Sequence, residues 1–269
     1  MLLLASFALL ASGLAQAFDH QHAALTTLLT RHVEWNAEGT ATAVDYAGMR
    51  RDRAVLGTYL TTLSAVTPAE HGRWSKDEQL AFLINAYNGW TLALIADADP
   101  EPASIRDLGG WFRSPWKQRF FTLLGESRSL DDVEHGLIRG APDFAEPRIH
   151  FAVNCASIGC PALRPEAYRA ADLEAQLEDQ TRRFLRDRTR NRYDVATRTL
   201  RVTRLFDWYG SDFDLPFRGS RTRSGFLLHY AEELALDAEA RRALGEGTLA
   251  IGFLEYDWRL NRRVASTGR

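Results

Sequence analysis

The alternation of apolar and polar positions predicts helices at the start of the chain. Between Phe18 and Leu63, apolar residues recur at the three- and four-residue spacing of a helix. A further short helix is expected to begin at Thr67, which can cap the first turn while Glu70 follows three residues later. Pro68 suits the first helical position, where its missing N–H costs nothing. These patterns predict a helical N-terminal region.

The segment from Trp74 to Ala96 has the clearest helical pattern in the chain. Ser75 can cap its first turn, and apolar side chains cover almost every face of the helix. A helix that is apolar all round must be surrounded by other elements. We therefore expect a buried central helix here.

Shorter patterns along the rest of the chain predict strands and further helices. A capping box at Asp131–Glu134 should open a short helix. The other expected elements are a β-hairpin at 120–130, a strand at 148–154, an amphipathic helix at 166–186, strands at 193–195 and 200–202, a helix near 226–234 and an aromatic segment at 251–260. No repeat or flexible linker divides them, so the sequence predicts a single α+β domain: a small antiparallel sheet packed against several helices.

Composition places the chain among soluble globular proteins. Its 269 residues are 45% hydrophobic and 25% charged, which excludes collagen-like, low-complexity and disordered classes. Lys+Arg 33 against Asp+Glu 35 gives a formal charge of −2, so no basic face is expected and nucleic acid is not an expected partner. A chain of this length can bury one sizeable core.

The first residues predict export. Residues 1–17 form an apolar run ending in the small-residue triplet Ala15-Gln16-Ala17, as in a secretory signal peptide cleaved before Phe18. No Lys or Arg precedes the run, which a misassigned start codon would explain; the alternative is a buried N-terminal helix. The run is shorter than the roughly 20 residues of a membrane span, and no later run is long enough. We expect a periplasmic or secreted protein, with residues 18–269 as one domain and no transmembrane segment.

Standard cofactor and hydrolase motifs do not occur in the sequence. It has no GxxxxGK[ST], GxGxxG, HExxH, CxxC or GxSxG pattern, so we expect no cofactor. Reactive side chains are instead concentrated in three short stretches. The aromatic segment 111–116 is either a rim for a sugar, peptide or aromatic ligand or an ordinary packed loop.

The first stretch lies within the expected central helix. Asn85 and Asn88 are three residues apart and therefore share a helix face. Buried amides must be hydrogen-bonded, at a cost of about 1–3 kcal/mol each when they are not. The two side chains either hold neighbouring loops or line a site.

The second stretch places Glu134 and His135 early in the helix at 131–140. The helix dipole favours a neutral imidazole near an N-terminus, which suits a general base or a metal ligand. The alternative is a surface or capping histidine.

The third stretch runs from His150 to Cys160. On a regular strand, His150 and Asn154 share one face, while Cys155 lies where the strand ends. A thiol near an imidazole is an activated nucleophile. Cys155 and Cys160, the two cysteines of the chain, could equally form a structural disulfide or serve redox or metal chemistry.

Four stretches, in order along the chain, resemble the DUF547 family, whose name records an unassigned function. They read AFLINAYNGW, SLDDVEHGLIRG, PRIHFAVNCASIGCPALRPEAY and FLEYDWRLN, so the resemblance covers a motif-bearing core of about residues 74–261. Many bacterial members of the family similarly begin with a signal peptide. Position by position, the family's motifs fall on Asn85, Tyr87, Asn88, Glu134, His135, His150 and Cys155. Cys160 is not part of the pattern in every branch, which implies a functional thiol at Cys155.

These residues together predict a thiol-dependent hydrolase or acyl transferase. Its substrate would be a small molecule, a peptide or a component of the cell envelope. The expected roles are Cys155 as nucleophile, His135 or His150 as base, Glu134 as the partner that orients the base, and Asn85, Tyr87, Asn88 and Asn154 as substrate or oxyanion contacts.

Two alternatives stand beside this prediction. One is a non-catalytic binding module in which buried Asn and His side chains hold a rigid loop and Cys155–Cys160 is a structural disulfide. The other is a metal site formed by His135, His150 and a cysteine, although their spacing matches no standard zinc signature.

Export can be tested directly on the protein. N-terminal sequencing of the periplasmic or secreted form should begin at Phe18 or within one or two residues of it. Recovery of an intact cytosolic species that begins at Met1 would contradict the prediction.

Overall fold

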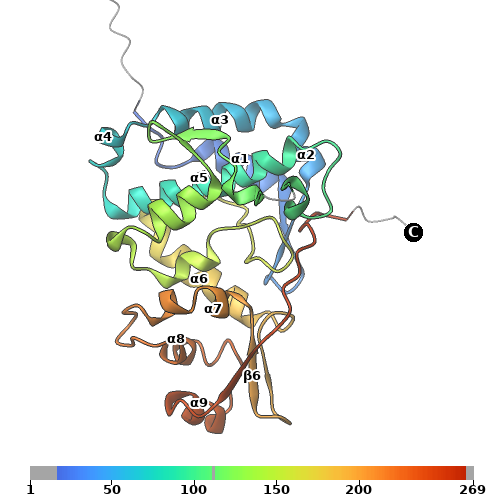
Figure 1. The fold of residues 1–269 in the computed structure, drawn as a ribbon, viewed down its shortest axis with the longest axis vertical. Helices are drawn as coiled ribbons and strands as arrows, with labels where there is room; N and C mark the ends of the chain where they lie inside the picture. The colour runs from blue at the N-terminus through green and yellow to red at the C-terminus, as the bar shows by residue number, and fades with distance from the viewer. Residues whose placement is uncertain (1–16, 111–112, 265–269) are drawn as a thin grey trace, which may run out of the picture.

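The computed structural model describes residues 17–110 and 113–264 (Figure 1). Residues 1–16, which carry most of the expected signal peptide, lie outside the described residues. The α-helices are α1 (Ala23–His32), α2 (Tyr46–Arg51), α3 (Arg53–Ala65), α4 (Pro68–His71), α5 (Lys76–Ala96), α6 (Leu173–Arg186), α7 (Leu205–Trp208), α8 (Arg223–His229) and α9 (Ala238–Gly245). The strands are β1 (Val33–Trp35), β2 (Thr42–Val44), β3 (Phe121–Leu123), β4 (Glu126–Arg128), β5 (Arg192–Asp194), β6 (Thr199–Val202) and β7 (Ala250–Phe253).

Short helical turns complete the described elements. The π-helix η3 spans Asp132–Ile138. The 3-10 turns are η1 (Ile105–Leu108), η2 (Pro115–Lys117), η4 (Pro142–Phe144), η5 (Pro147–Phe151), η6 (Ala170–Asp172) and η7 (Gly210–Asp214). Three of them, η2, η5 and η7, carry side chains of the site described below.

Helix α5 is the buried centre of the larger part of the molecule, as the sequence predicts. Ser75 and Glu78 form a reciprocal capping box at its start, and nearly every side chain from Leu80 onward is buried. Helices α2 and α3 pack against it. The predicted cap of α4 is also confirmed, since the Thr67 side chain accepts a hydrogen bond from the backbone N–H of Glu70.

The strands form three small sheets in the described part of the chain, so the α+β class is confirmed. Two are antiparallel hairpins, β1–β2 and β3–β4. The third has the order β5–β6–β7, in which β6 and β7 run parallel. The hairpin β1–β2 interrupts the region in which helical spacing was the expected pattern, because the Asn36 side chain and Gly39 close a tight turn there.

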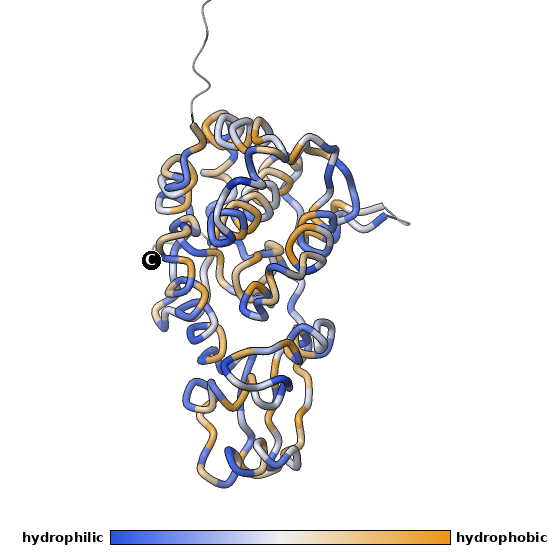
Figure 2. The backbone as a smooth tube through the Cα atoms, turned by 90° about the vertical axis from the view of Figure 1, so that its left-hand side faces the viewer, coloured by the Kyte–Doolittle hydropathy of each residue, from blue (hydrophilic) through white to orange (hydrophobic). Residues whose placement is uncertain are grey.

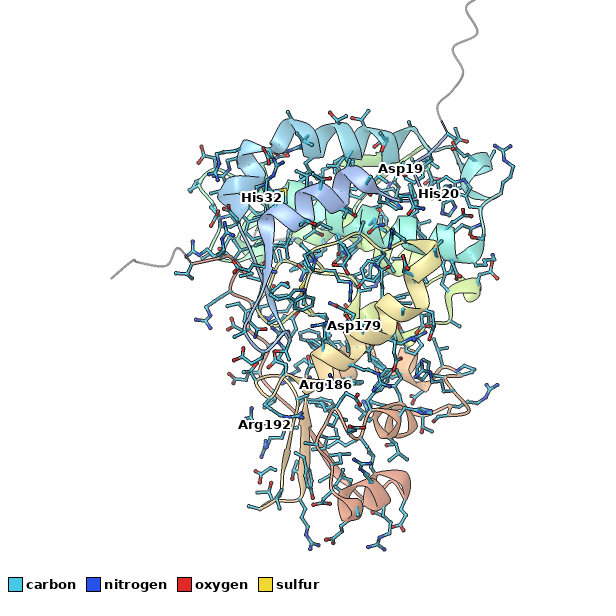
Figure 3. All side chains as sticks on the ribbon, turned by 180° about the vertical axis from the view of Figure 1, so that it is seen from behind. Asp19, His20, His32, Asp179, Arg186 and Arg192 are labelled. Carbon is cyan, nitrogen blue, oxygen red and sulfur yellow. A yellow bond between two sulfur atoms is a disulfide. The ribbon has the colours of Figure 1, made fainter. Side chains whose placement is uncertain are left out.

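Two apolar cores lie one above the other, and α6 spans both. The first core surrounds α5, and the second lies beneath α7, α8 and the three-stranded sheet. Leu173 and Leu177 of α6 belong to the first core, whereas Phe184 and Leu185 belong to the second. Figure 2 shows the same arrangement as a larger and a smaller part of one body. Asp179 and Arg186 mark the exposed side of α6 in the rear view (Figure 3).

The prediction of a strand at 148–154 is wrong. Residues Pro147–Phe151 form the 3-10 turn η5, and none of the described strands pairs with residues 152–154 after it. Pro147 suits the first position of a helical turn, and the Glu146 side chain caps that turn by accepting from the Arg148 N–H. His150 and Asn154 therefore do not share the face of a strand, although the sequence predicts that they do.

Two helix starts also differ from the expectation. The capping box of the short helix at 131–140 joins Ser129 to Asp132 instead of Asp131 to Glu134. Helix α6 begins at Leu173, later than the expected residue 166. The residues before it cannot continue a helix, because side-chain amides of Asn85 and Gln176 already hold their backbone groups.

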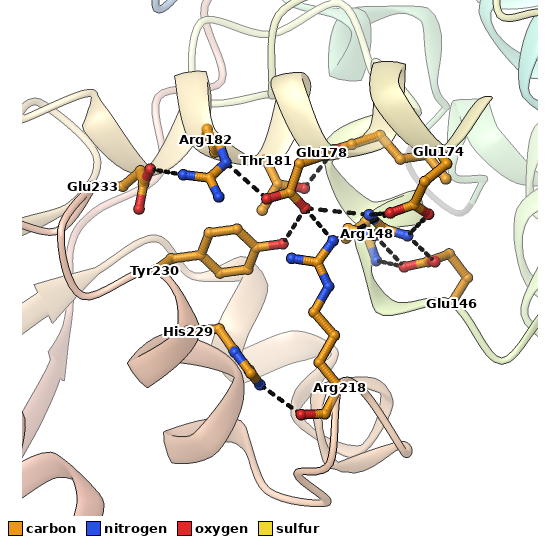
Figure 4. A network of polar contacts seen from close by, with 11 residues as sticks. Glu146, Arg148, Glu174, Glu178, Thr181, Arg182, Arg218, His229, Tyr230 and Glu233 are labelled. Atoms are coloured by element: carbon orange, nitrogen blue, oxygen red, sulfur yellow. Dashed lines mark hydrogen bonds and ion pairs between the residues drawn. The ribbon is translucent and has the colours of Figure 1, made fainter. Parts of the chain in front are cut away.

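A buried arginine joins η5 to α6 and to the second core (Figure 4). The guanidinium of Arg148, whose side chain is 4% exposed, donates to carboxylate oxygens of Glu146 and Glu174 at 2.5–2.9 Å. Glu178 accepts from it at 3.3 Å, and also accepts from Arg218 and Tyr230. Burial would lower the pKa of Arg148, but the carboxylates outweigh burial and raise it. These ion pairs of Arg148 therefore fix the turn η5, which carries His150, to helix α6.

In the described part of the chain, no helix has the length and apolar character needed to cross a membrane.

The histidine at the start of α1 makes stability depend on pH. His22 is buried, and its Nδ1 lies 2.8 Å from the Tyr59 hydroxyl. Burial lowers the pKa of His22 from 6.5 to about 4, although the charge of Asp19 opposes this shift. The unfolded chain therefore binds a proton that the folded chain excludes. The stabilisation is complete above pH 6.5 and is lost as the pH falls toward 4.

Replacing this histidine should make the free energy of unfolding depend less on pH between pH 7 and pH 4. Between pH 7 and pH 4, wild type should lose about 3 kcal/mol more unfolding free energy than His22→Asn, which has no titrating group. Asparagine tolerates the left-handed backbone of this position, where φ is 48°. Urea denaturation at the two pH values measures the difference. Equal losses in both proteins would contradict the assignment.

Candidate functional site

A cavity of about 200 Å³ lies at the junction of the two cores. It collects side chains from α5, η3, η5, α7 and the C-terminal segment, which are far apart in the sequence. The lining residues are Tyr87, Trp116, Asp131, Glu134, His135, His150, Val153, Cys155, Cys160, Pro161, Leu205, Trp208, Tyr209, Tyr256 and Trp258. The four expected catalytic residues, together with Tyr87, are therefore neighbours in space.

His150 is fixed in the wall of this cavity by Asp212. Its Nε2 lies 2.7 Å from Asp212 Oδ2, and its ring stacks on Tyr209 with centroids 4.3 Å apart. Burial would raise the pKa of Asp212, but hydrogen bonds from His150 and Arg139 outweigh burial and hold the pKa well below its usual range. The carboxylate is thus ionised and accepts the Nε2 proton. A neutral His150 then carries no proton on Nδ1, which can act as a base.

Arg139 connects the two histidines of the site. Its Nε donates to Asp212 Oδ2 at 2.6 Å, and its Nη1 lies 2.8 Å from His135 Nδ1. Because a guanidinium can only donate, His135 Nδ1 is the acceptor and its ring proton is on Nε2. The guanidinium also lies over the Tyr209 ring, 4.7 Å from its centroid. Of the two imidazoles, His150 is buried and its Nδ1 has no hydrogen-bond partner among the described residues, whereas His135 is 39% exposed and its Nδ1 accepts from Arg139.

Glu134 is a buried carboxylate beside tyrosines. It is 6% exposed, and its Oε1 lies 4.0 Å from His135 Nδ1, beyond hydrogen-bonding distance. Burial raises the pKa of Tyr87 and of Tyr209, and the charge of Glu134 raises both further. The sequence predicts that Glu134 orients the base. In the structure Asp212 occupies that position.

The sulfur atoms at the cavity wall form a disulfide between Cys155 and Cys160. The backbone N–H of Cys155 donates to Cys160 Sγ at 2.9 Å. The Tyr256 hydroxyl lies 3.3 Å from Cys155 Sγ and 3.1 Å from Cys160 Sγ. In the part of the chain that the structure describes, neither sulfur makes a hydrogen bond to an imidazole. The polar side chains that contact the pair are therefore the Tyr256 phenol and the Ser157 hydroxyl, which lies 3.7 Å from Cys155 Sγ.

The C-terminal segment places Tyr256 and an indole in the cavity. It runs from β7 back toward β2, where the backbone of Val44 pairs with Asn261 and Arg263 (Figure 1). On the way it pairs with the loop after Cys155, because the N–H groups of Ile158 and Gly159 donate to carbonyls of this segment. A Cβ at residue 159 would lie 2.9 Å from the Tyr256 ring, so glycine is required for this close approach.

Comparison with known proteins identifies the segment that carries most of these residues. Residues 72–185 match the family described as "Protein of unknown function, DUF547". This segment is similar to DUF547 domains. No curated protein and no solved structure matches the chain. The matched segment includes Glu134, His135, His150 and Cys155, whereas Asp212 and the C-terminal aromatic residues lie beyond it.

The asparagine side chains of the matched segment form hydrogen bonds with backbone groups of neighbouring loops. Asn88 Nδ2 donates to the Ala152 carbonyl, and Asn88 Oδ1 accepts from the Asn154 N–H. Asn85 makes the same pair of bonds with the backbone of Tyr168. The Asn154 amide bonds within its own loop, to Pro161 and Ala156. None of the three lines the cavity, so the structure places these expected substrate contacts behind the site instead of in it.

Several residues of the site could not be identified by sequence reasoning. Asp212 lies in η7, 62 residues after His150, in a short polar segment that carries no motif. Tyr256 and Trp258 lie in the last stretch that resembles the family, but the sequence predicts no role for them. Trp116 came from the aromatic segment at 111–116 and does line the cavity, whereas Trp111 and Phe112 are outside the described residues.

Among the described residues, no three His, Cys, Asp or Glu side chains gather where they could hold a metal ion. His135, His150 and the cysteines are therefore not such a group.

The role of Asn88 predicts a loss of stability on substitution. Asn88→Leu, of similar volume, leaves the Ala152 carbonyl and the Asn154 N–H without partners, which should cost about 1–3 kcal/mol for each group. Thr91→Val, one turn along α5, is the matched control. The Thr91 hydroxyl is buried and has no hydrogen-bond partner among the described residues, so its removal should change little. Chemical denaturation measures both, and equal effects of the two substitutions would contradict the assignment.

Proposed function

We propose that this protein is a thiol-dependent hydrolase or acyl transferase that acts after export. The observation that supports this proposal is the Asp212–His150 pair on the same cavity as Cys155. A carboxylate that holds one imidazole nitrogen leaves the other free to activate a nucleophile, as in acyl-transfer triads. His150 is the base in this proposal, and Asp212 orients it.

The reaction begins from the reduced cysteines. A dithiol gives two electrons and two protons to the Cys155–Cys160 disulfide and is itself oxidised, which leaves two thiols in the cavity wall. His150 Nδ1 then takes the Cys155 proton, and the thiolate attacks the carbonyl carbon of an ester or amide. A carbon–sulfur bond forms, the leaving group departs with the proton from His150, and water or another acceptor cleaves the thioester.

Tyr256 is the donor best placed for the oxyanion. Its hydroxyl lies 3.3 Å from Cys155 Sγ, so it faces the space beside the carbon that the sulfur would attack. Burial raises its pKa, and the hydroxyl therefore keeps its proton at neutral pH and can donate. This role replaces the one expected for Asn85 or Asn154, whose amides bond to backbone.

The disulfide favours a second candidate function. With both sulfur atoms bonded and no imidazole hydrogen-bonded to them among the described residues, the cavity is also suited to binding without catalysis. In that case His150 and Asp212 stabilise the junction of the two cores, and the aromatic walls hold a ligand. Thiol reactivity distinguishes the two functions.

The test measures alkylation of Cys155. In Cys160→Ser, which frees Cys155 as the single thiol, iodoacetamide should react at pH 7 about five- to tenfold faster than with a model thiol. His150→Ala should return the rate to that of the model thiol. His135→Ala is the matched control, because that imidazole lines the same cavity but its Nδ1 is held by Arg139. Mass spectrometry follows the reaction.

One result would replace the proposal by the binding function. This is a freed Cys155 that alkylates at the rate of a model thiol and is indifferent to both histidine substitutions. Wild type without reductant should not react, since both of its cysteines are in the disulfide.

A further inference from the structure

One side of the cavity is a continuous aromatic wall. The indole of Trp258 lies 4.5 Å from the Tyr256 ring, 5.7 Å from Trp208 and 5.8 Å from Trp116, centroid to centroid. Trp208 and Tyr256 are in turn 5.0 Å apart. All four rings line the cavity, and they come from η2, α7 and the C-terminal segment. A ligand in the cavity can therefore contact the faces of these aromatic rings.

Two carboxylates also line the cavity. Asp131 and Glu134 lie on the same turn at the start of η3. Within the described residues, no Arg or Lys lies within 4.0 Å of either carboxylate, and the nearest ring nitrogens are those of His135, at 3.8 Å from Asp131 and 4.0 Å from Glu134. Glu134 is 94% buried, with an exposed fraction of 6%. Tyr87 and Tyr209 hydrogen-bond to Glu134, but they leave its negative charge without a counter-ion, which a ligand cation can supply.

The neighbouring arginines are engaged elsewhere. Arg139 donates to Asp212, and Arg190 donates to the Cys160 carbonyl and pairs with Asp187. Arg106 stacks on Trp258, 5.2 Å from the ring centroid, which shows that this indole accepts a cation. No Arg or Lys is among the described residues that line the cavity. The charge of the cavity walls is therefore negative.

We propose that this cavity binds an organic ammonium group of the substrate, held between the aromatic wall and the carboxylates of Asp131 and Glu134. Rings and carboxylates together favour a cation over an anion, through the ring quadrupoles and through charge pairing. A volume of about 200 Å³ is below the usual range for a drug-sized ligand, so it accommodates a head group or side-chain end. The inference rests on the proposed function in making this group part of a substrate of Cys155. The binding itself requires no thiol.

The experiment uses the full, oxidised protein, in which no thiol chemistry takes place. Choline and n-butylammonium are titrated while NMR follows the indole N–H resonances of Trp116, Trp208 and Trp258. The neutral isostere of choline, 3,3-dimethylbutan-1-ol, is the matched ligand. We expect both ammonium ions to shift these resonances with saturation, and the alcohol to bind about tenfold more weakly or not at all.

Two substitutions test the carboxylates. Glu134→Gln should weaken ammonium binding about tenfold and leave binding of the neutral alcohol unchanged. Glu126→Gln is the control, because that carboxylate is 67% exposed and does not line the cavity. If Glu134→Gln does not fold by circular dichroism, Asp131→Asn gives the same comparison.

Three results would overturn the inference: no shift with either ammonium ion, equal affinity for choline and its alcohol isostere, or unchanged affinity in the carboxylate variants. Because the disulfide is intact throughout, none of them depends on whether Cys155 is a nucleophile. If the protein binds ammonium ions but Cys155 shows no enhanced thiol reactivity, this inference stands and the proposed hydrolase function is wrong.

Discussion

The site depends on how the backbone of residues 147–161 satisfies its hydrogen bonds. This segment passes between two apolar cores, with Ile149 in one and Phe151 in the other. Its last residues pair with the C-terminal segment, but none of the described strands pairs with residues 147–155. Buried N–H and C=O groups need partners. Asn88 and Asn154 supply them from their side chains. The amide of Asn88 therefore takes the place of a neighbouring strand, and it fixes the path of the chain from His150 to Cys155.

A second constraint is electrostatic and acts on the charged residues around the cavity. Asp212 accepts from His150 and from Arg139, so one carboxylate sets the proton positions on both histidines, directly at His150 and through Arg139 at His135. With Arg139 engaged in this way, Glu134 is left facing tyrosines and the open cavity. The same cavity therefore carries a base and sulfur together with two carboxylates and aromatic rings. A substrate with an ammonium group near its reactive carbonyl would match both sets of residues.

Sequence patterns predicted the local elements well and the assembly of the site less well. The apolar helix α5, its Ser75 cap and the hairpin β3–β4 follow from spacing and capping alone. The strand expected at 148–154 failed because β-forming residues do not make a strand without a partner, and an asparagine side chain supplied the hydrogen bonds instead. Residues resembling DUF547 motifs identified His150 and Cys155. Asp212 could not be found in this way, because its pairing with His150 exists only in three dimensions.

The most direct test of this account is the thiol pKa of Cys155 in Cys160→Ser, measured by the ultraviolet absorbance of the thiolate across pH. If Asp212 stabilises the imidazolium of His150, the thiol should titrate clearly below the ordinary value of about 8.5. Adding Asp212→Asn should raise the pKa back toward that value. Asp207→Asn, which removes a 40% exposed carboxylate on the neighbouring helix α7, should leave it unchanged. A thiol that titrates near 8.5 with and without Asp212 would contradict the account.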